Sequence, residues 1–81
     1  MVTLNITYNG LSVDYGQSIA TGLRDEDIRR MAAEVVRSGE LPGLHIANLA
    51  DTAFDGHVVD RVTTSDGQAR VYLRPKVPFG A

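Results

Sequence analysis

The chain has 81 residues and a formal net charge of −2, and apolar residues make up 43% of it. This length favours one small domain, and the apolar fraction is typical of a folded chain. The absence of cysteine excludes disulfides, thiol catalysis and thiolate zinc sites, while the near-neutral charge argues against broad nucleic-acid binding. No apolar run approaches the roughly 20 residues that span a bilayer, so we expect a cytoplasmic protein with no membrane partner.

Residues 2–15 predict a β-hairpin. Apolar and polar side chains alternate on both sides of Asn9-Gly10, and alternation with period two is typical of a half-buried strand. The pair Asn-Gly is the strongest two-residue signal for a hairpin turn. A turn at these two residues places three apolar pairs on one face: Tyr8 with Leu11, Ile6 with Val13, and Leu4 with Tyr15.

Residues 26–38 have the apolar spacing of an amphipathic helix. Asp25 is the predicted N-cap, Gly39 is the predicted residue after the helix, and Pro42 prevents its continuation. The stripe that faces the hairpin comprises Ile28, Met31, Ala32, Val35 and Val36. We expect this stripe to cover Leu4, Ile6 and Val13.

The second half of the chain predicts further strands at 44–49, 57–62 and 69–74. A loop at 51–56 separates the first two, and a hairpin turn at 65–67 separates the last two. The order of elements therefore predicts an α+β fold, in which one helix packs on a mixed sheet of four or five strands.

This order resembles the β-grasp, or ubiquitin-like, fold. Two segments carry the resemblance: the helix exit Val36-Arg37-Ser38-Gly39-Glu40-Leu41-Pro42 and the final strand Arg70-Val71-Tyr72-Leu73-Arg74. The resemblance implies that residues 1–75 form a β-grasp-like domain whose last strand lies beside the first. Residues 76–81 would then form an extended tail.

The tail differs from that of conjugated ubiquitin-like proteins, which end in Gly-Gly. This chain ends in Phe79-Gly80-Ala81, so modification of other proteins through Gly80 would require removal of Ala81. Many β-grasp proteins are never conjugated and act only as binding modules. The resemblance therefore implies binding to another protein, with conjugation through the tail as a further hypothesis.

The last two strands predict a basic face for such binding. A two-residue turn at Asp66-Gly67 places Val58, Val62, Val71 and Leu73 in the core. Asp60 then opposes Leu73 on the core face, which suggests a bulge or a shift in register. The other face carries Arg61, Arg70, Tyr72 and Arg74, and Tyr and Arg are favoured at protein interfaces. The predicted binding residues are these four together with Lys76, Phe79 and Gly80 of the tail.

The sequence predicts neither an enzyme nor a bound cofactor. The possible metal ligands His45, Asp51, Asp55 and His57 match no ligand spacing, and no serine lies in a nucleophile motif. An alternative is an inhibitor of a protease or another enzyme, acting through the 51–56 loop. Two segments faintly resemble potato-type serine protease inhibitors, Asp60-Arg61-Val62 and Val77-Pro78-Phe79-Gly80, although the N-terminal hairpin does not fit that family.

Overall fold

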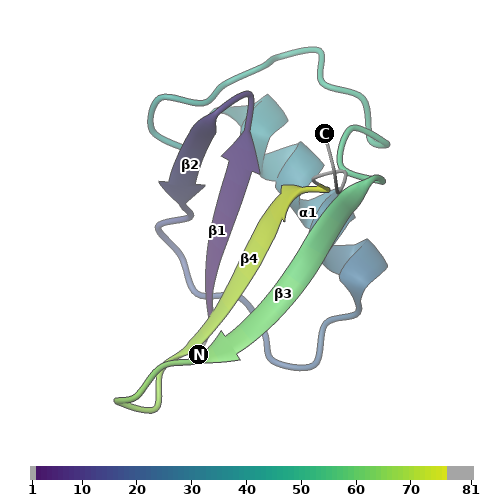
Figure 1. The fold of residues 1–81 in the computed structure, drawn as a ribbon. Coiled ribbons are helices and arrows are strands. Elements are labelled where there is room, and N and C mark those ends of the chain that lie inside the picture. Colours follow the sequence, from purple (N-terminus) through teal and green to yellow (C-terminus); the bar gives the residue numbers. More distant parts are fainter. Residues whose placement is uncertain (1, 77–81) are drawn as a thin grey trace.

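The computed structural model describes residues 2–76 and contains one helix and one four-stranded sheet. The sheet has the order β2-β1-β4-β3, in which β1 and β4 run parallel and the other neighbours run antiparallel (Figure 1). This arrangement confirms the predicted α+β class and is consistent with β-grasp topology. In chain order the elements are β1 (Val2–Tyr8), β2 (Leu11–Asp14), α1 (Asp25–Ser38), β3 (His57–Thr63) and β4 (Ala69–Pro75).

The predicted N-terminal hairpin is confirmed with its register. Ile6 pairs with Val13 and Tyr8 pairs with Leu11. The turn residues Asn9 and Gly10 both have positive φ, at 50° and 80°. A turn with two such residues has the backbone twist that matches antiparallel strands, which explains why Asn-Gly is a reliable signal here.

Helix α1 lies across one face of the sheet, behind the strands in Figure 1. Its buried side chains pack with those of β1 and β4 in one apolar cluster, and Met31 is only partly buried. The cluster includes Leu4, Ile6 and, at its margin, Val13, as predicted. The helix residues that are buried are Ile28, Ala32, Ala33, Val35 and Val36.

The prediction that Asp25 is the N-cap is wrong by one residue. Arg24 occupies the N-cap with extended backbone angles, and its carbonyl accepts the amide of Ile28 at 3.1 Å. The Asp27 carboxylate accepts the Arg24 amide at 3.3 Å, which closes the first turn from the other side. Asp25 is the first helical residue, so its carboxylate is available for a contact described below. At the other end, Gly39 has a φ of 82° and ends the helix as predicted.

The predicted strand at 44–49 is absent, and residues 40–56 form a series of turns. Their hydrogen bonds are mostly local: Leu44 donates to the carbonyl of Leu41 and Leu49 to that of Ile46. Leu44 and Leu49 are buried in the core without any strand partner for this segment. Turns rather than a strand therefore bring Leu44 and Leu49 into the interior.

The turn between β3 and β4 differs from the prediction and determines which side chains face outward. Thr64 donates to the carbonyl of Gln68 at 2.8 Å, so three residues rather than two form the loop. The last of them, Gly67, has a φ of 84°, as the third position of such a loop requires. The shift of one residue brings Val59 opposite Leu73 and Arg61 opposite Val71. It turns every β3 side chain to the face opposite the predicted one.

Candidate functional site

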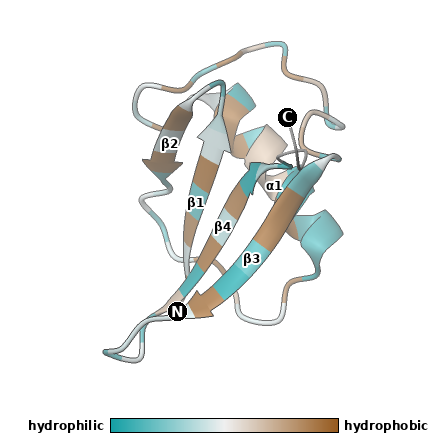
Figure 2. Cartoon of the chain, in the orientation of Figure 1, coloured by the Kyte–Doolittle hydropathy of each residue, from teal (hydrophilic) through white to brown (hydrophobic). Residues whose placement is uncertain are grey.

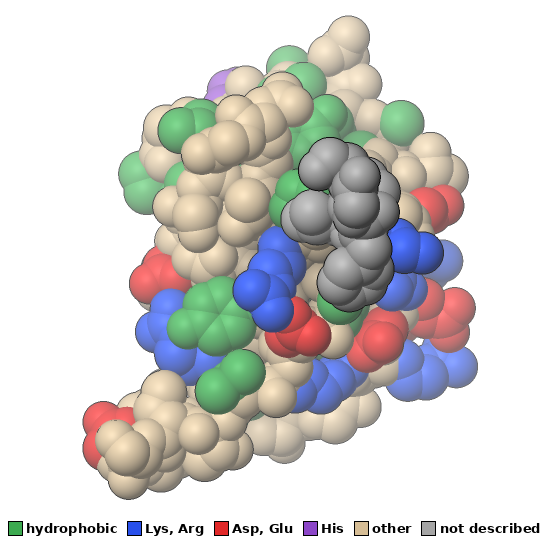
Figure 3. Space-filling view, in the orientation of Figure 1, with side chains coloured by type: hydrophobic (Ala, Val, Ile, Leu, Met, Phe, Trp, Pro, Cys, Tyr) green, Lys and Arg blue, Asp and Glu red, His purple; other side chains and the backbone are tan. Residues whose placement is uncertain are grey.

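We call the side of the sheet away from α1 the outer face. Its side chains alternate with the buried ones, as the change from brown to white and teal along β1, β3 and β4 indicates (Figure 2). Figure 3 views the molecule from this side and shows hydrophobic, basic and acidic side chains close together over the strands. From β2 to β3 across the sheet, the outer face comprises Ser12, Asp14, Thr3, Asn5, Thr7, Arg70, Tyr72, Arg74, Val58, Asp60 and Val62.

The structure brings three of the predicted binding residues together on this face. Arg70, Tyr72 and Arg74 follow one another at every second position of β4. Lys76 is exposed just beyond the end of that strand. Phe79 and Gly80, the remaining predicted tail residues, lie outside the described residues.

Arg61 is the exception, and the prediction that it shares this face is wrong. Because of the shifted register, it lies opposite Val71 on the helix side of the sheet. Its Nη2 atom donates to the Leu23 carbonyl at 2.8 Å and to the Asp25 carboxylate at 2.7 Å. The guanidinium therefore joins β3 to the segment that enters α1 and has a structural partner there.

A continuous hydrogen-bonded network crosses three strands of the outer face. Asp14 Oδ1 accepts from Asn5 Nδ2 and from Arg70 Nη2, each at 2.8 Å. Arg70 Nε donates to the Tyr72 hydroxyl at 2.9 Å, and its guanidinium carbon lies 5.4 Å from the centre of the Tyr72 ring. The network begins at Ser12, whose hydroxyl donates to Asn5 at 2.9 Å. The two contacts from Arg70 restrain the orientation of the Tyr72 ring.

The hydrogen bonds of this network, assisted by its charges, shift two pKa values in the direction expected for an ion pair. The hydrogen bond from Asn5 is the main cause that lowers the pKa of Asp14, opposed by partial burial and assisted by Arg70. The Asp14 carboxylate in turn raises the pKa of Arg70, with a second contribution from the Tyr72 hydroxyl. Both groups are therefore held in their charged forms.

The outer face is charge-balanced, whereas the sequence predicted a basic one. Arg74 Nε donates to Asp60 Oδ2 at 2.7 Å, and a second guanidinium nitrogen contacts the same oxygen. Arg70 is paired with Asp14 through one guanidinium nitrogen, Nη2. Each arginine of the face thus has an acidic partner, and Tyr72 lies on β4 between the two pairs.

Val58 and Val62 were predicted to lie in the core but are exposed on the outer face. Their exposed fractions are 38% and 45%, and they are two of the three large hydrophobic side chains exposed among residues 2–76. They flank Asp60, which pairs across the strands with Tyr72. The sequence did contain a signal for this arrangement, because the predicted register placed the Asp60 carboxylate in the core opposite Leu73.

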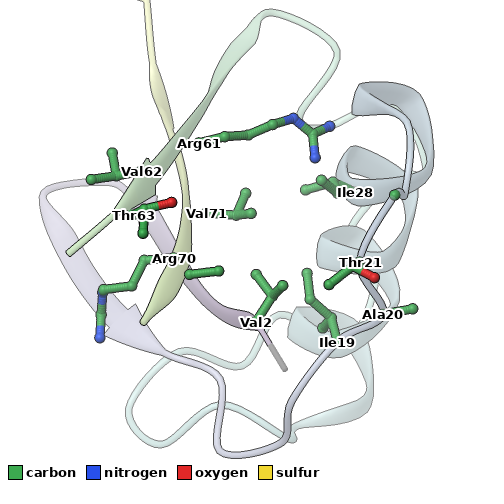
Figure 4. A pocket seen from close by; sticks show the side chains of 12 residues that line it. Val2, Ile19, Ala20, Thr21, Ile28, Arg61, Val62, Thr63, Arg70 and Val71 are labelled. Carbon is green, nitrogen blue, oxygen red and sulfur yellow. The ribbon is translucent and has the colours of Figure 1, made fainter. Parts of the chain in front are cut away.

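Two hollows lie elsewhere on the described part of the molecule. One, of about 180 Å³, lies between β3, β4 and the entry to the helix (Figure 4). Val2, Ile19 and Val71 point into it, whereas Arg70 and Val62 point away. The other, of about 460 Å³, has an almost entirely charged lining: Glu26, Arg29, Arg30, Asp51, Thr52 and Asp55.

The 51–56 loop, the predicted site of an inhibitor, is held against the body of the protein. The Phe54 side chain is fully buried. Arg37 donates to the Asp51 carboxylate at 2.7 Å and to the carbonyl of Leu49 at 2.9 Å. Short-range bonds wind the segment into turns, as Asp55 donates to Thr52 and His57 donates to Phe54.

Comparison of the chain with protein-family models, curated proteins and solved structures gives no match. Within residues 2–76, no helix combines the length and the apolar character needed to cross a membrane.

Proposed function

We propose that this chain is a non-catalytic protein-binding domain, and that it binds another protein through the outer face around Tyr72. The observation that carries the proposal is an oriented tyrosine beside two exposed valines on a face whose arginines are already paired. Aromatic and arginine side chains are enriched at protein interfaces, where Lys, Glu, Asp and Ser are depleted. The two aspartates of this face are each paired with an arginine. Neither Lys nor Glu occurs on the described outer face.

The order of Tyr72 supports binding because it lowers the entropy lost when a partner docks. Immobilising a side chain on binding costs about 0.5–1.5 kcal/mol when the side chain is rotamer-rich, and less for tyrosine, which has only two side-chain torsions. Here Arg70 already restrains the ring by a hydrogen bond and by stacking. The balanced charges also reduce the free-energy cost of desolvation, because each carboxylate and guanidinium keeps its partner when water leaves the interface.

The hollows of the described residues favour binding over catalysis. Sites for small molecules usually occupy about 300–1,000 Å³ and are mostly apolar with a few convergent polar groups. The partly apolar hollow is smaller than this at about 180 Å³, and no apolar residue lines the larger one. The buried Phe54 likewise favours the outer face over the inhibitor hypothesis, because an inhibitory loop must be presented to its target.

The β-grasp-like topology supports the finer proposal that the chain is related to ubiquitin-like proteins. Its central parallel pair, β1 and β4, is the feature that the resemblance implied. The hypothesis of conjugation depends on Gly80, which lies outside the described residues, and stays a prediction. Intact-mass measurement in the host tests it, because a chain found only in free form with Ala81 retained would contradict it.

The test of binding compares Tyr72→Ala with Leu11→Ala. Leu11 is the third exposed large hydrophobic residue and lies on β2, at the opposite edge of the sheet. Protein captured from the host by the unmodified chain is identified, and its affinity for each variant is then measured by calorimetry. We expect Tyr72→Ala to weaken binding by about 2 kcal/mol, roughly 30-fold, as for a central interface residue. Equal loss in the two variants, or none in a folded Tyr72→Ala, would rule out this surface.

A further inference from the structure

The free edge of β3 offers unpaired backbone groups. In the described sheet, β3 has β4 on one side and no strand on the other. The Thr64 N–H donates across the hairpin to the Gln68 carbonyl. In an antiparallel ladder such bonds recur at every second residue, so every second residue from Thr64 back to Val58 is bonded to β4. The N–H and C=O groups of the alternate residues point away from the sheet. These residues are Val59, Arg61 and Thr63.

The neighbouring residue His57 agrees with this alternation. Its N–H and C=O groups also point away from the sheet, and both have hydrogen-bond partners outside it. Its N–H donates to the Phe54 carbonyl at 2.9 Å, and its C=O accepts from Arg29 Nε at 3.1 Å. Contacts within the molecule thus cover the start of the edge, and among residues 2–76 we find no hydrogen bond to the outward backbone groups of Val59, Arg61 and Thr63.

This edge has few of the features by which proteins usually prevent edge pairing. Natural edge strands are short, are interrupted by proline or a bulge, or carry charged side chains, including charges that point inward. Strand β3 has no proline or bulge and pairs with β4 without a break over all seven residues. Its two charged residues are already in ion pairs, Asp60 with Arg74 and Arg61 with Asp25. No net charge on the strand therefore opposes a second strand.

We propose that the edge binds a second copy of this chain, with the two β3 strands antiparallel about a two-fold axis at Asp60. Asp60 is the middle residue of β3, so this register overlaps the strands along their whole length. It also places each Val58 opposite Val62 of the second copy. Shifting the register by two residues in either direction would place a valine opposite Asp60. The pattern is therefore self-complementary, as a two-fold interface requires.

The charges at the axis are neutralised within each chain. The two Asp60 carboxylates meet near the axis as like charges, which repel each other. The ion pair of each with the Arg74 guanidinium of its own chain reduces this repulsion, so the register rests on the valine pairs and not on charge. The two sheets become continuous, and their outer faces lie side by side. The dimer rests on the edge of β3 and does not depend on the proposed role of Tyr72.

Single cysteines test the register directly, because the chain contains no cysteine of its own. Residues directly opposite in antiparallel strands have Cβ atoms about 4.5–5.5 Å apart, within reach of a disulfide. We expect Asp60→Cys to form a disulfide-linked dimer under mild oxidation. Val58→Cys alone and Val62→Cys alone should not, since four residues of strand, about 13 Å, separate each from its copy. An equal mixture of Val58→Cys and Val62→Cys should yield the mixed dimer.

The matched control for these variants is Leu11→Cys, an exposed position on β2. Oxidation of Asp60→Cys no faster than that of Leu11→Cys would overturn the proposal. So would efficient linkage of Val58→Cys to itself, because that result would indicate another register.

Sedimentation of the unmodified chain provides the second measurement. We expect a dimer that dissociates on dilution. The dimer dissociation constant of Arg61→Pro should be at least tenfold higher than that of Arg61→Ala. Both variants lose the ion pair, but only proline removes the outward N–H, and an edge strand tolerates proline there. If Arg61→Pro does not fold, the cysteine variants decide. A chain that stays monomeric at every attainable concentration, or that pairs this edge only with a strand of another protein, would overturn the dimer.

Discussion

Phe54 anchors an irregular segment, and its removal should destabilise the whole domain. The side chain is fully buried although it lies among turns. Its ring makes edge contacts with Tyr8 at 5.5 Å and with His57 at 4.8 Å between ring centres. Truncation of a buried phenylalanine to alanine costs about 3–5 kcal/mol, because it removes apolar contacts and leaves a cavity. We expect the loss of unfolding free energy in Phe54→Ala to lie within this range.

This loss is large relative to the total stability of so short a chain. At about 0.05–0.15 kcal/mol per residue, 81 residues give a free energy of unfolding of roughly 4–12 kcal/mol. Phe54→Ala should therefore lower the melting temperature by at least about 12 °C, at 4–8 °C per kcal/mol for this size. Urea denaturation followed by circular dichroism measures the change, since the chain lacks tryptophan.

Two variants provide the controls for Phe54→Ala. Phe54→Leu keeps most of the volume and should cost clearly less, and Leu11→Ala removes an exposed side chain and should cost under about 1 kcal/mol. A loss below about 1 kcal/mol for Phe54→Ala would refute the reasoning. It would mean that residues 51–56 are not held by their aromatic side chain, as the inhibitor hypothesis requires.

Three further predictions concern the turn, the network and the corrected arginine. Gly67→Ala should cost about 1–2 kcal/mol in urea denaturation, because φ is 84° there, whereas Gly16→Ala should be nearly neutral; equal effects would contradict the three-residue turn. The lowered pKa of Asp14 stabilises the fold above its unfolded value near pH 4, and acid removes this contribution as pH falls through the lower folded pKa. Asp14→Asn should therefore be less stable than the unmodified chain by under about 1 kcal/mol at pH 7, with the difference shrinking near pH 3; a constant difference would argue against the ion pair. Arg61→Ala should cost under about 1 kcal/mol and leave binding at Tyr72 unchanged, as calorimetry with the captured partner would measure; weakened binding would return Arg61 to the site.

The parts of the fold that the sequence predicted are those controlled by local chemistry. Asn9-Gly10 adopts the positive φ angles of a tight turn, and this alone fixes the register of the first hairpin. The spacing of apolar residues from Ile28 to Val36 similarly fixed the buried side of the helix. In both cases neighbouring residues in the chain carry the whole signal.

The incorrect predictions concern features that depend on competition between similar local choices. Residues 65–67 can form a loop of two or three residues, and the Thr64 side chain favours the longer one through its bond to the Gln68 amide at 3.1 Å. The one extra residue in the loop shifts the register and so decides the side of the sheet on which Arg61 and Val62 lie. Apolar residues at 44–49 fit a strand equally well, but the local hydrogen bonds of this segment close turns, so it adds to neither edge of the sheet. The position of Asp60 was the one sign in the sequence that the simpler register was wrong.

The central claim, that the outer face of β3 and β4 binds a partner, is tested most directly by an NMR titration. The labelled chain is titrated with the captured partner, and the methyl signals of Val58 and Val62 are followed together with the ring of Tyr72. We expect these signals to shift most, while Leu11 and the 51–56 segment stay unchanged. Shifts confined to 51–56 or to the exposed side of α1, with the Tyr72 ring unaffected, would contradict the claim.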